Sequence, residues 1–103
     1  MDIAFATRSR FLDSCEDAIR RGRADLDAGG AVRVLFEEGG YPGRVVVTIR
    51  EGDSGWFGTD WEGADETRFP ARIKAAATAL MHCGCTGRFL IAHTDGAMEI
   101  SRA

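Results

Sequence analysis

The sequence predicts one small α+β domain, a two-layer sandwich in which a four-stranded antiparallel sheet carries two helices on one face. Two stretches, residues 8–28 and 69–83, have apolar residues at helical spacing. Each stretch is followed by two short runs of strand-like sequence, as expected for paired strands. The expected order of elements over residues 1–103 is therefore αββαββ.

The first helix is expected over residues 8–28. Its apolar stripe contains Phe11, Cys15, Ile19 and Leu26, and its acidic residues precede its arginines, an order that suits the helix dipole. Residues 2–6 fit either a short strand or an early helical turn. If they form a strand, the alternative fold is a ferredoxin-like order with an extra hairpin strand.

The first hairpin is expected to join residues 32–38 to residues 44–50 through a glycine-rich turn. The apolar residues of both strands share one sheet face only if the numbers of paired residues add up to an odd value. A five-residue loop would pair Glu38 with Arg44, and these two residue numbers add up to an even value. A β-bulge or an even-length loop is therefore predicted here.

The second helix is expected over residues 69–83, with Thr67 as its N-cap, Pro70 in its first turn and Gly84 just after its end. Strands 88–94 and 97–102 then flank Asp95-Gly96, a strong signal for a two-residue hairpin turn. Pairing Thr94 with Ala97 places five residues on one face: Phe89, Ile91, His93, Met98 and Ile100.

The composition is that of an ordinary soluble globular domain, since 45% of residues are hydrophobic and 28% are charged. The net charge of −3 argues against a general nucleic-acid binder, which usually carries a basic surface. No run approaches the roughly 18 apolar residues of a membrane span, and the first residues lack a signal-peptide pattern. The three cysteines do not have the spacing of a disulfide framework. We expect a cytoplasmic protein with free thiols and no membrane contact.

Residues 51–67 are the most unusual part of the chain. This segment holds six carboxylates, two tryptophans, one phenylalanine and four glycines, and it lacks lysine, arginine and proline. We expect a long acidic and aromatic loop, and irregular segments of this length are often functional. Tryptophan is enriched where proteins bind one another, and carboxylates favour a basic partner. The expected partner-binding residues are Trp56, Phe57, Asp60, Trp61, Glu62 and Asp65. Alternatively, the tryptophan rings cap the core.

No cofactor or catalytic motif is recognisable, so no catalytic residue, metal ligand or cofactor is expected. Four residues still form a loose group that an enzyme or a metal protein could use, namely His82, Cys83, Cys85 and His93. Their spacing matches no usual zinc pattern. Structural roles explain the thiols, because free cysteine is among the most buried residue types. His93 is expected at the edge of the core with a hydrogen-bond partner.

The favoured function is a small non-catalytic module that binds a basic protein partner through the 51–67 loop, as an inhibitor or nucleic-acid mimic in one version. The first alternative is an accessory nucleic-acid-binding domain that uses the arginines of the first helix, which are Arg8, Arg10, Arg20, Arg21 and Arg23. The second is the enzyme or metal protein described above. A homodimer is also compatible with the small residues Ala71, Ala75, Thr78 and Ala79 on the second helix.

Overall fold

A computed structural model describes residues 2–6, 11–36, 43–52, 57–63, 70–94 and 96–103 of the chain. It shows a small α+β domain whose elements follow one another as β1 (Asp2–Ala6), α1 (Phe11–Arg21), α2 (Arg23–Asp27), β2 (Ala31–Phe36), β3 (Gly43–Ile49), β4 (Phe57–Gly63), α3 (Pro70–His82), β5 (Gly87–Thr94) and β6 (Ala97–Arg102). None of the helices in these described ranges is long and apolar enough to cross a membrane.

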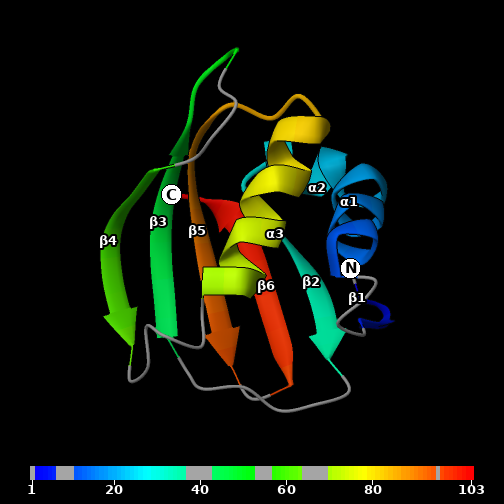
Figure 1. Ribbon diagram of the computed structural model, residues 1–103. Coiled ribbons are helices and arrows are strands. Elements are labelled where there is room, and N and C mark those ends of the chain that lie inside the picture. The colour runs from blue at the N-terminus through cyan, green and yellow to red at the C-terminus, as the bar shows by residue number, and fades with distance from the viewer. Residues whose placement is uncertain (1, 7–10, 37–42, 53–56, 64–69, 95) are drawn as a thin grey trace.

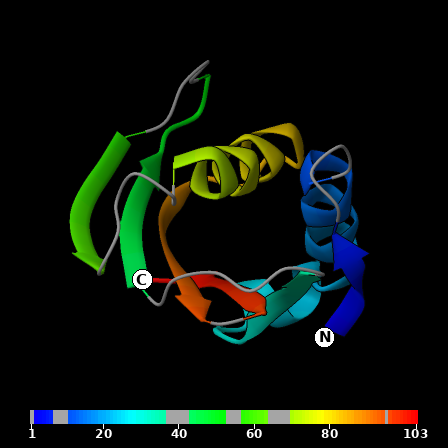
Figure 2. The ribbon, with the colours of Figure 1, turned by 60° about the horizontal axis from the view of Figure 1, so that its bottom comes forward.

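The strands form one sheet in the order β1-β2-β6-β5-β3-β4 (Figure 1). All neighbours are antiparallel except β1, which runs parallel to β2. The sheet curves, and α1 and α3 lie on its inner side (Figure 2). The four predicted strands are thus adjacent and antiparallel, as expected. The sheet is longer than predicted because β1 and β4 extend its two edges.

Residues 2–6 form a strand, which decides between the two alternatives that the sequence left open. This strand lies at an edge and parallel to β2. The αββαββ order lacks this strand, whereas the ferredoxin-like alternative includes it. The chain crosses from β1 to β2 through α1 and α2, as a parallel pair of strands requires.

The predicted first hairpin is wrong. β2 pairs with β6, and β3 pairs with β5 on one side and β4 on the other. The physical reason is that these long-range pairings bring fully buried side chains together, such as Val32 with Ile100 and Val47 with Phe89. The bulge predicted for this hairpin is therefore not needed. Register shifts occur instead between β1 and β2 and, at Val46/Val47, between β3 and β4.

The predicted second hairpin is confirmed in its register. Thr94 is opposite Ala97, and His93 is opposite Met98. The five residues predicted to share a face are all buried. This face carries the core, together with the buried residues of β2, β3, α1 and α3.

The predicted first helix is two helices, with the break at Gly22. Gly22 has φ −98° and ψ 13°, and α2 begins at the next residue. A Cβ on Gly22 would lie 2.2 Å from Cγ1 of Val32, so glycine lets the helix junction approach β2 very closely. Within α1, salt bridges join Arg20 to Glu16 and Arg21 to Asp17. Residues 8–10 lie outside the described ranges.

The C-terminal end of α3 agrees with the prediction. Gly84 has φ +72°, and its N–H donates to the carbonyl of Met81 at 3.0 Å. The N–H of Cys85 donates to the carbonyl of Leu80 at 2.9 Å. This pair of bonds defines a Schellman motif, in which the residue after the glycine also makes an apolar contact with the helix. Cys85 and Leu80 accordingly belong to the same buried cluster. The predicted N-cap, Thr67, lies outside the described ranges.

The small residues of α3 serve the core more than was predicted. Ala79 is fully buried, and α3 packs against α1. Ala79 is therefore not available for contact with a second copy of the chain. Its small side chain lies in the core. Ala75 and Thr78 are half-buried, and the side chain of Ala71 lies outside what the structure describes.

Candidate functional site

The predicted acidic loop contains an edge strand. Phe57, Asp60, Trp61 and Glu62 belong to β4, so residues 51–67 do not form one unpaired loop as predicted. Trp56 and Asp65 lie outside the described residues. The signal was present in the sequence, since Phe57, Thr59 and Trp61 alternate as strand residues do. The glycines and carboxylates between them, which are typical of loops, obscured it.

β4 is paired with β3 in a register that can be read residue by residue. Trp61 lies opposite Val45, Asp60 opposite Val46 and Glu62 opposite Arg44. Glu62 and Arg44 are therefore cross-strand neighbours of opposite charge, an arrangement that favours pairing. Beyond the register shift, Gly58 lies opposite Val47. The shift leaves Thr59 as the extra residue on β4, which is the definition of a β-bulge.

The outer side of β4 is an edge of the sheet. β3 is its neighbour on one side, and none of the described strands lies on the other. In Figures 1 and 2, β4 lies beyond the area that α3 covers. Every second backbone N–H and C=O of a strand points to each side. One set of these groups on β4 is thus directed away from β3, in the form that a further strand can pair with.

The four residues of the enzyme and metal alternative are spread over different environments. Among the described residues, no group of three or more His, Cys, Asp or Glu side chains is placed to hold a metal ion. Nδ1 of His82 and Oε1 of Glu16 are 2.6 Å apart. The Cys83 thiol donates to the backbone carbonyl of Glu16 at 3.9 Å, and Cys85 is buried in the core. These contacts join α1 to the end of α3.

His93 is a buried histidine with a hydrogen-bond partner, as predicted. It is 2% exposed, and its Nε2 contacts Nη1 of Arg72. A guanidinium can only donate hydrogen bonds, so Nε2 of His93 must accept this one and carries no proton. Arg72 also lies over the ring of Phe11, 5.4 Å from its centre. The pair thus connects the first turns of α1 and α3 to β5.

Arg102 holds the C-terminal end of β6 in place. Its guanidinium donates to the carbonyl of Thr86 and to Asp27, each at 3.0 Å, and lies 4.9 Å from the centre of the Phe89 ring. The hydrogen bond from Arg102 is the main cause that lowers the pKa of Asp27 below its usual range, and Arg23 adds to it. One arginine therefore links α2, the start of β5 and the core.

Three of the arginines proposed for nucleic-acid contacts, Arg20, Arg21 and Arg23, are engaged within the domain. Arg20 and Arg21 pair with acids one turn away, and Arg23 lies 3.1 Å from Asp27. Arg23 also donates to the carbonyl of Cys83 at 2.8 Å. Arg8 and Arg10 lie outside the described residues. The described arginines of this region thus have nearby acids that reduce their net positive field.

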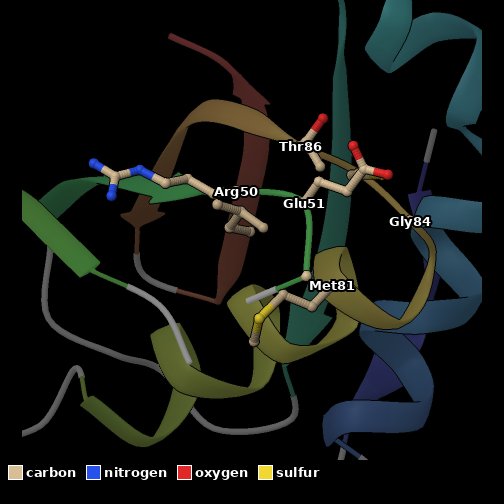
Figure 3. A pocket seen from close by; sticks show the side chains of 8 residues that line it. Arg50, Glu51, Met81, Gly84 and Thr86 are labelled. Carbon is tan, nitrogen blue, oxygen red and sulfur yellow. The ribbon is translucent and has the colours of Figure 1, made fainter. Parts of the chain in front are cut away.

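A pocket of about 390 Å³ opens where β3 ends and α3 gives way to β5 (Figure 3). Figure 3 shows Glu51 and Thr86 on one side of it, Met81 below them, and Arg50 extending away. The pocket is lined by Ile49, Arg50, Glu51, Gly52, Met81, Gly84, Cys85 and Thr86. Gly52 and Gly84 both have positive φ and open space where a Cβ would stand. The surface that lines the pocket is more polar than apolar, and the pocket lies at the start of the acidic segment.

The three thiols are free, and burial makes them weak acids. Burial raises the pKa of Cys15 from 9.0 to about 12, and the neighbouring Glu16 carboxylate adds to the increase. Burial is also the main cause that raises the pKa of Cys83 and Cys85. A thiol reacts as its thiolate, so these environments suit packing and not nucleophilic chemistry.

We expect Cys15 to make the folded domain less stable in alkaline solution. The unfolded chain releases this proton near pH 9.0, whereas the folded chain keeps it up to about pH 12. Between these values the unfolded state binds fewer protons, so the free energy of unfolding falls as pH rises. The contribution of this thiol to the slope is at most about 1.4 kcal/mol per pH unit.

Urea unfolding at about pH 8 and about pH 10 measures this effect. The stability advantage of the wild type over Cys15→Ala should shrink at the higher pH. The variant controls for every other group that titrates in this range. An advantage that stays constant would show that the Cys15 thiol does not ionise on unfolding.

No protein-family model, curated protein or solved structure matches this chain. The residues and their geometry therefore carry the functional argument.

Proposed function

We propose that this chain is a non-catalytic protein-binding module that engages a basic protein partner through its acidic and aromatic segment, residues 51–67. The observation that carries the proposal is the position of β4, an edge strand within this segment. Asp60, Trp61 and Glu62 follow one another on that edge. Four further carboxylates of the segment, Glu51, Asp53, Asp65 and Glu66, flank the strand in the sequence.

The carboxylates and the aromatic residues of the segment contribute to binding in different ways. Carboxylates attract a positively charged surface and speed its approach. Tryptophan supplies large apolar area with few rotatable bonds, and a few such residues commonly provide most of the binding energy. A partner that normally binds nucleic-acid phosphates fits this description, in which case the chain acts as an inhibitor. The three free cysteines support a location in the reducing cytoplasm.

We expect the double variant Trp56→Ala/Trp61→Ala to lose partner binding and to keep its fold. Hot-spot residues of this type contribute at least about 2 kcal/mol, so the dissociation constant should rise by at least about 30-fold. The measurement has two parts. Cross-linking and mass spectrometry identify the basic partner of the wild type, and calorimetry with the purified partner then compares the variants.

The matched control is Asp25→Asn, which changes an exposed acid on α2 away from the segment. It should bind as the wild type does. Circular dichroism and urea unfolding of all three proteins complete the test. Partner affinity unchanged by the double variant would exclude the tryptophans as anchors. An unfolded double variant would show that the rings belong to the core, as the alternative interpretation holds.

A further inference from the structure

The outer edge of β4 is suited to pairing with another strand. β4 is seven residues long and stands at the end of the sheet. At about 3.3 Å per residue it presents about 23 Å of edge. Its inner neighbour β3 pairs with it over Gly43–Thr48 with one register shift at Val46/Val47, and on either side of that shift β4 has the extended form that a new strand needs.

The other edge of the sheet is less suited to this role. β1 is in contact with α1 of the helix layer. β4, in contrast, lies beyond α3 in both views (Figures 1 and 2).

The residues of β4 select against a second copy of this chain. A symmetric antiparallel pairing centred on the strand would place Asp60 opposite Asp60. Like charges directly opposite one another destabilise a strand pair, and inward or flanking charges are a common protection of sheet edges against self-association. The five other carboxylates in residues 51–67 would add to the repulsion.

The same carboxylates are complementary to a basic strand. The sheet itself provides an example, because Glu62 is already opposite Arg44 on the β3 side. A basic residue opposite Asp60 or Glu62 on the outer side would repeat this arrangement. Charge complementarity thus rewards a basic strand at the positions where it penalises an acidic one.

We propose that β4 binds a basic, extended segment of the partner protein as an additional strand of the sheet. Main-chain hydrogen bonds to the outer edge of Phe57–Gly63 provide affinity, and the carboxylates of Asp60 and Glu62 select lysine and arginine at alternate positions. This inference rests on the proposed function, which it deepens by stating how the partner binds.

The test uses a synthetic peptide of about ten residues in which lysine or arginine alternates with valine or threonine. Two further peptides have the same sequence and carry N-methyl groups on the odd-numbered or the even-numbered amides. N-methylation removes a donor and keeps the charge. In an added strand only one set of amides faces β4, so the two methylated peptides should differ in affinity by at least tenfold. Calorimetry at low salt measures this.

A second comparison tests the charges. Asp60→Asn/Glu62→Gln should weaken binding of the unmodified peptide by at least about tenfold, as expected for two lost charge pairs. Asp25→Asn should leave it unchanged. Far-ultraviolet circular dichroism verifies that each variant is folded.

Each outcome decides the inference. Equal binding of the two methylated peptides would overturn strand addition, and the proposed function would remain because the peptide still binds. No binding of the unmodified peptide would also overturn strand addition. The proposed function is tested separately, by cross-linking of a basic partner and by the effect of Trp56→Ala/Trp61→Ala on its affinity. A concentration-dependent dimer of the wild type that Asp60→Asn/Glu62→Gln strengthens would support the stated role of the carboxylates. A dimer that this variant abolishes would overturn the choice of a foreign strand.

Discussion

Replacing Phe89 with alanine is expected to lower the free energy of unfolding by about 3–5 kcal/mol. Phe89 is fully buried in the middle of the sheet, and it lies opposite Val47 on one side and Arg102 on the other. The variant loses the transfer free energy of the ring and leaves a cavity that the surrounding strands fill only in part. A domain of this size has only about 5–15 kcal/mol in total, so much of its stability would be lost.

Urea unfolding followed by circular dichroism measures this loss. The control is Leu90→Ala, because Leu90 is the next residue on the same strand and is only half-buried. Its side chain belongs to the opposite face of the sheet, and its replacement should cost clearly less. Equal losses for the two variants would contradict the assignment of the core to the helix-covered face.

Replacing Gly22 with alanine is expected to destabilise the domain by about 1–3 kcal/mol, although alanine is the better helix former. The new methyl group would lie 2.2 Å from Cγ1 of Val32 and 3.1 Å from the carbonyl oxygen of Ala18. Val32 is fully buried and β-branched, so it has little freedom to move aside. The clash would push the α1–α2 junction away from β2.

A double-mutant cycle separates this clash from a backbone effect. Val32→Ala alone should cost about 2 kcal/mol, from two lost methyl groups and the cavity. In the Val32→Ala background, Gly22→Ala should cost much less than in the wild type, because the obstructing atom is gone. Losses that simply add would show that Gly22 is required for its backbone conformation instead.

Local signals in the sequence predicted the second half of the fold well. Asp95-Gly96 and the residue alternation on either side specify the register of the β5–β6 hairpin, and Gly84 specifies the end of α3. Each of these signals involves residues close together in the chain. The cysteine and histidine assignments succeeded for the same reason, since helical spacing and strand alternation already place Cys15 and His93 on the core face.

Long-range pairing could not be predicted in the same way. β2 and β3 both alternate apolar and polar residues, and this pattern does not say which strand lies beside which. Four of the six partner-binding residues, Phe57, Asp60, Trp61 and Glu62, lie on strand β4, which the pattern did not reveal. The acidic residues and glycines of β4 lower its strand propensity, and pairing with β3 overrides that preference.

The order of the strands has a consequence for how the protein folds as it is synthesised. β2 and β3 follow one another in the chain, but β6 and β5 separate them in the sheet. Among the described strands, those of the hairpin of residues 87–102 therefore connect the unit β1-α1-α2-β2 to the unit β3-β4 within the sheet. The ribosome makes this hairpin last among the described elements. Until it emerges, each unit exposes an unpaired inner strand, and the late arrival of the central strands makes this a chain for which chaperone protection during synthesis matters.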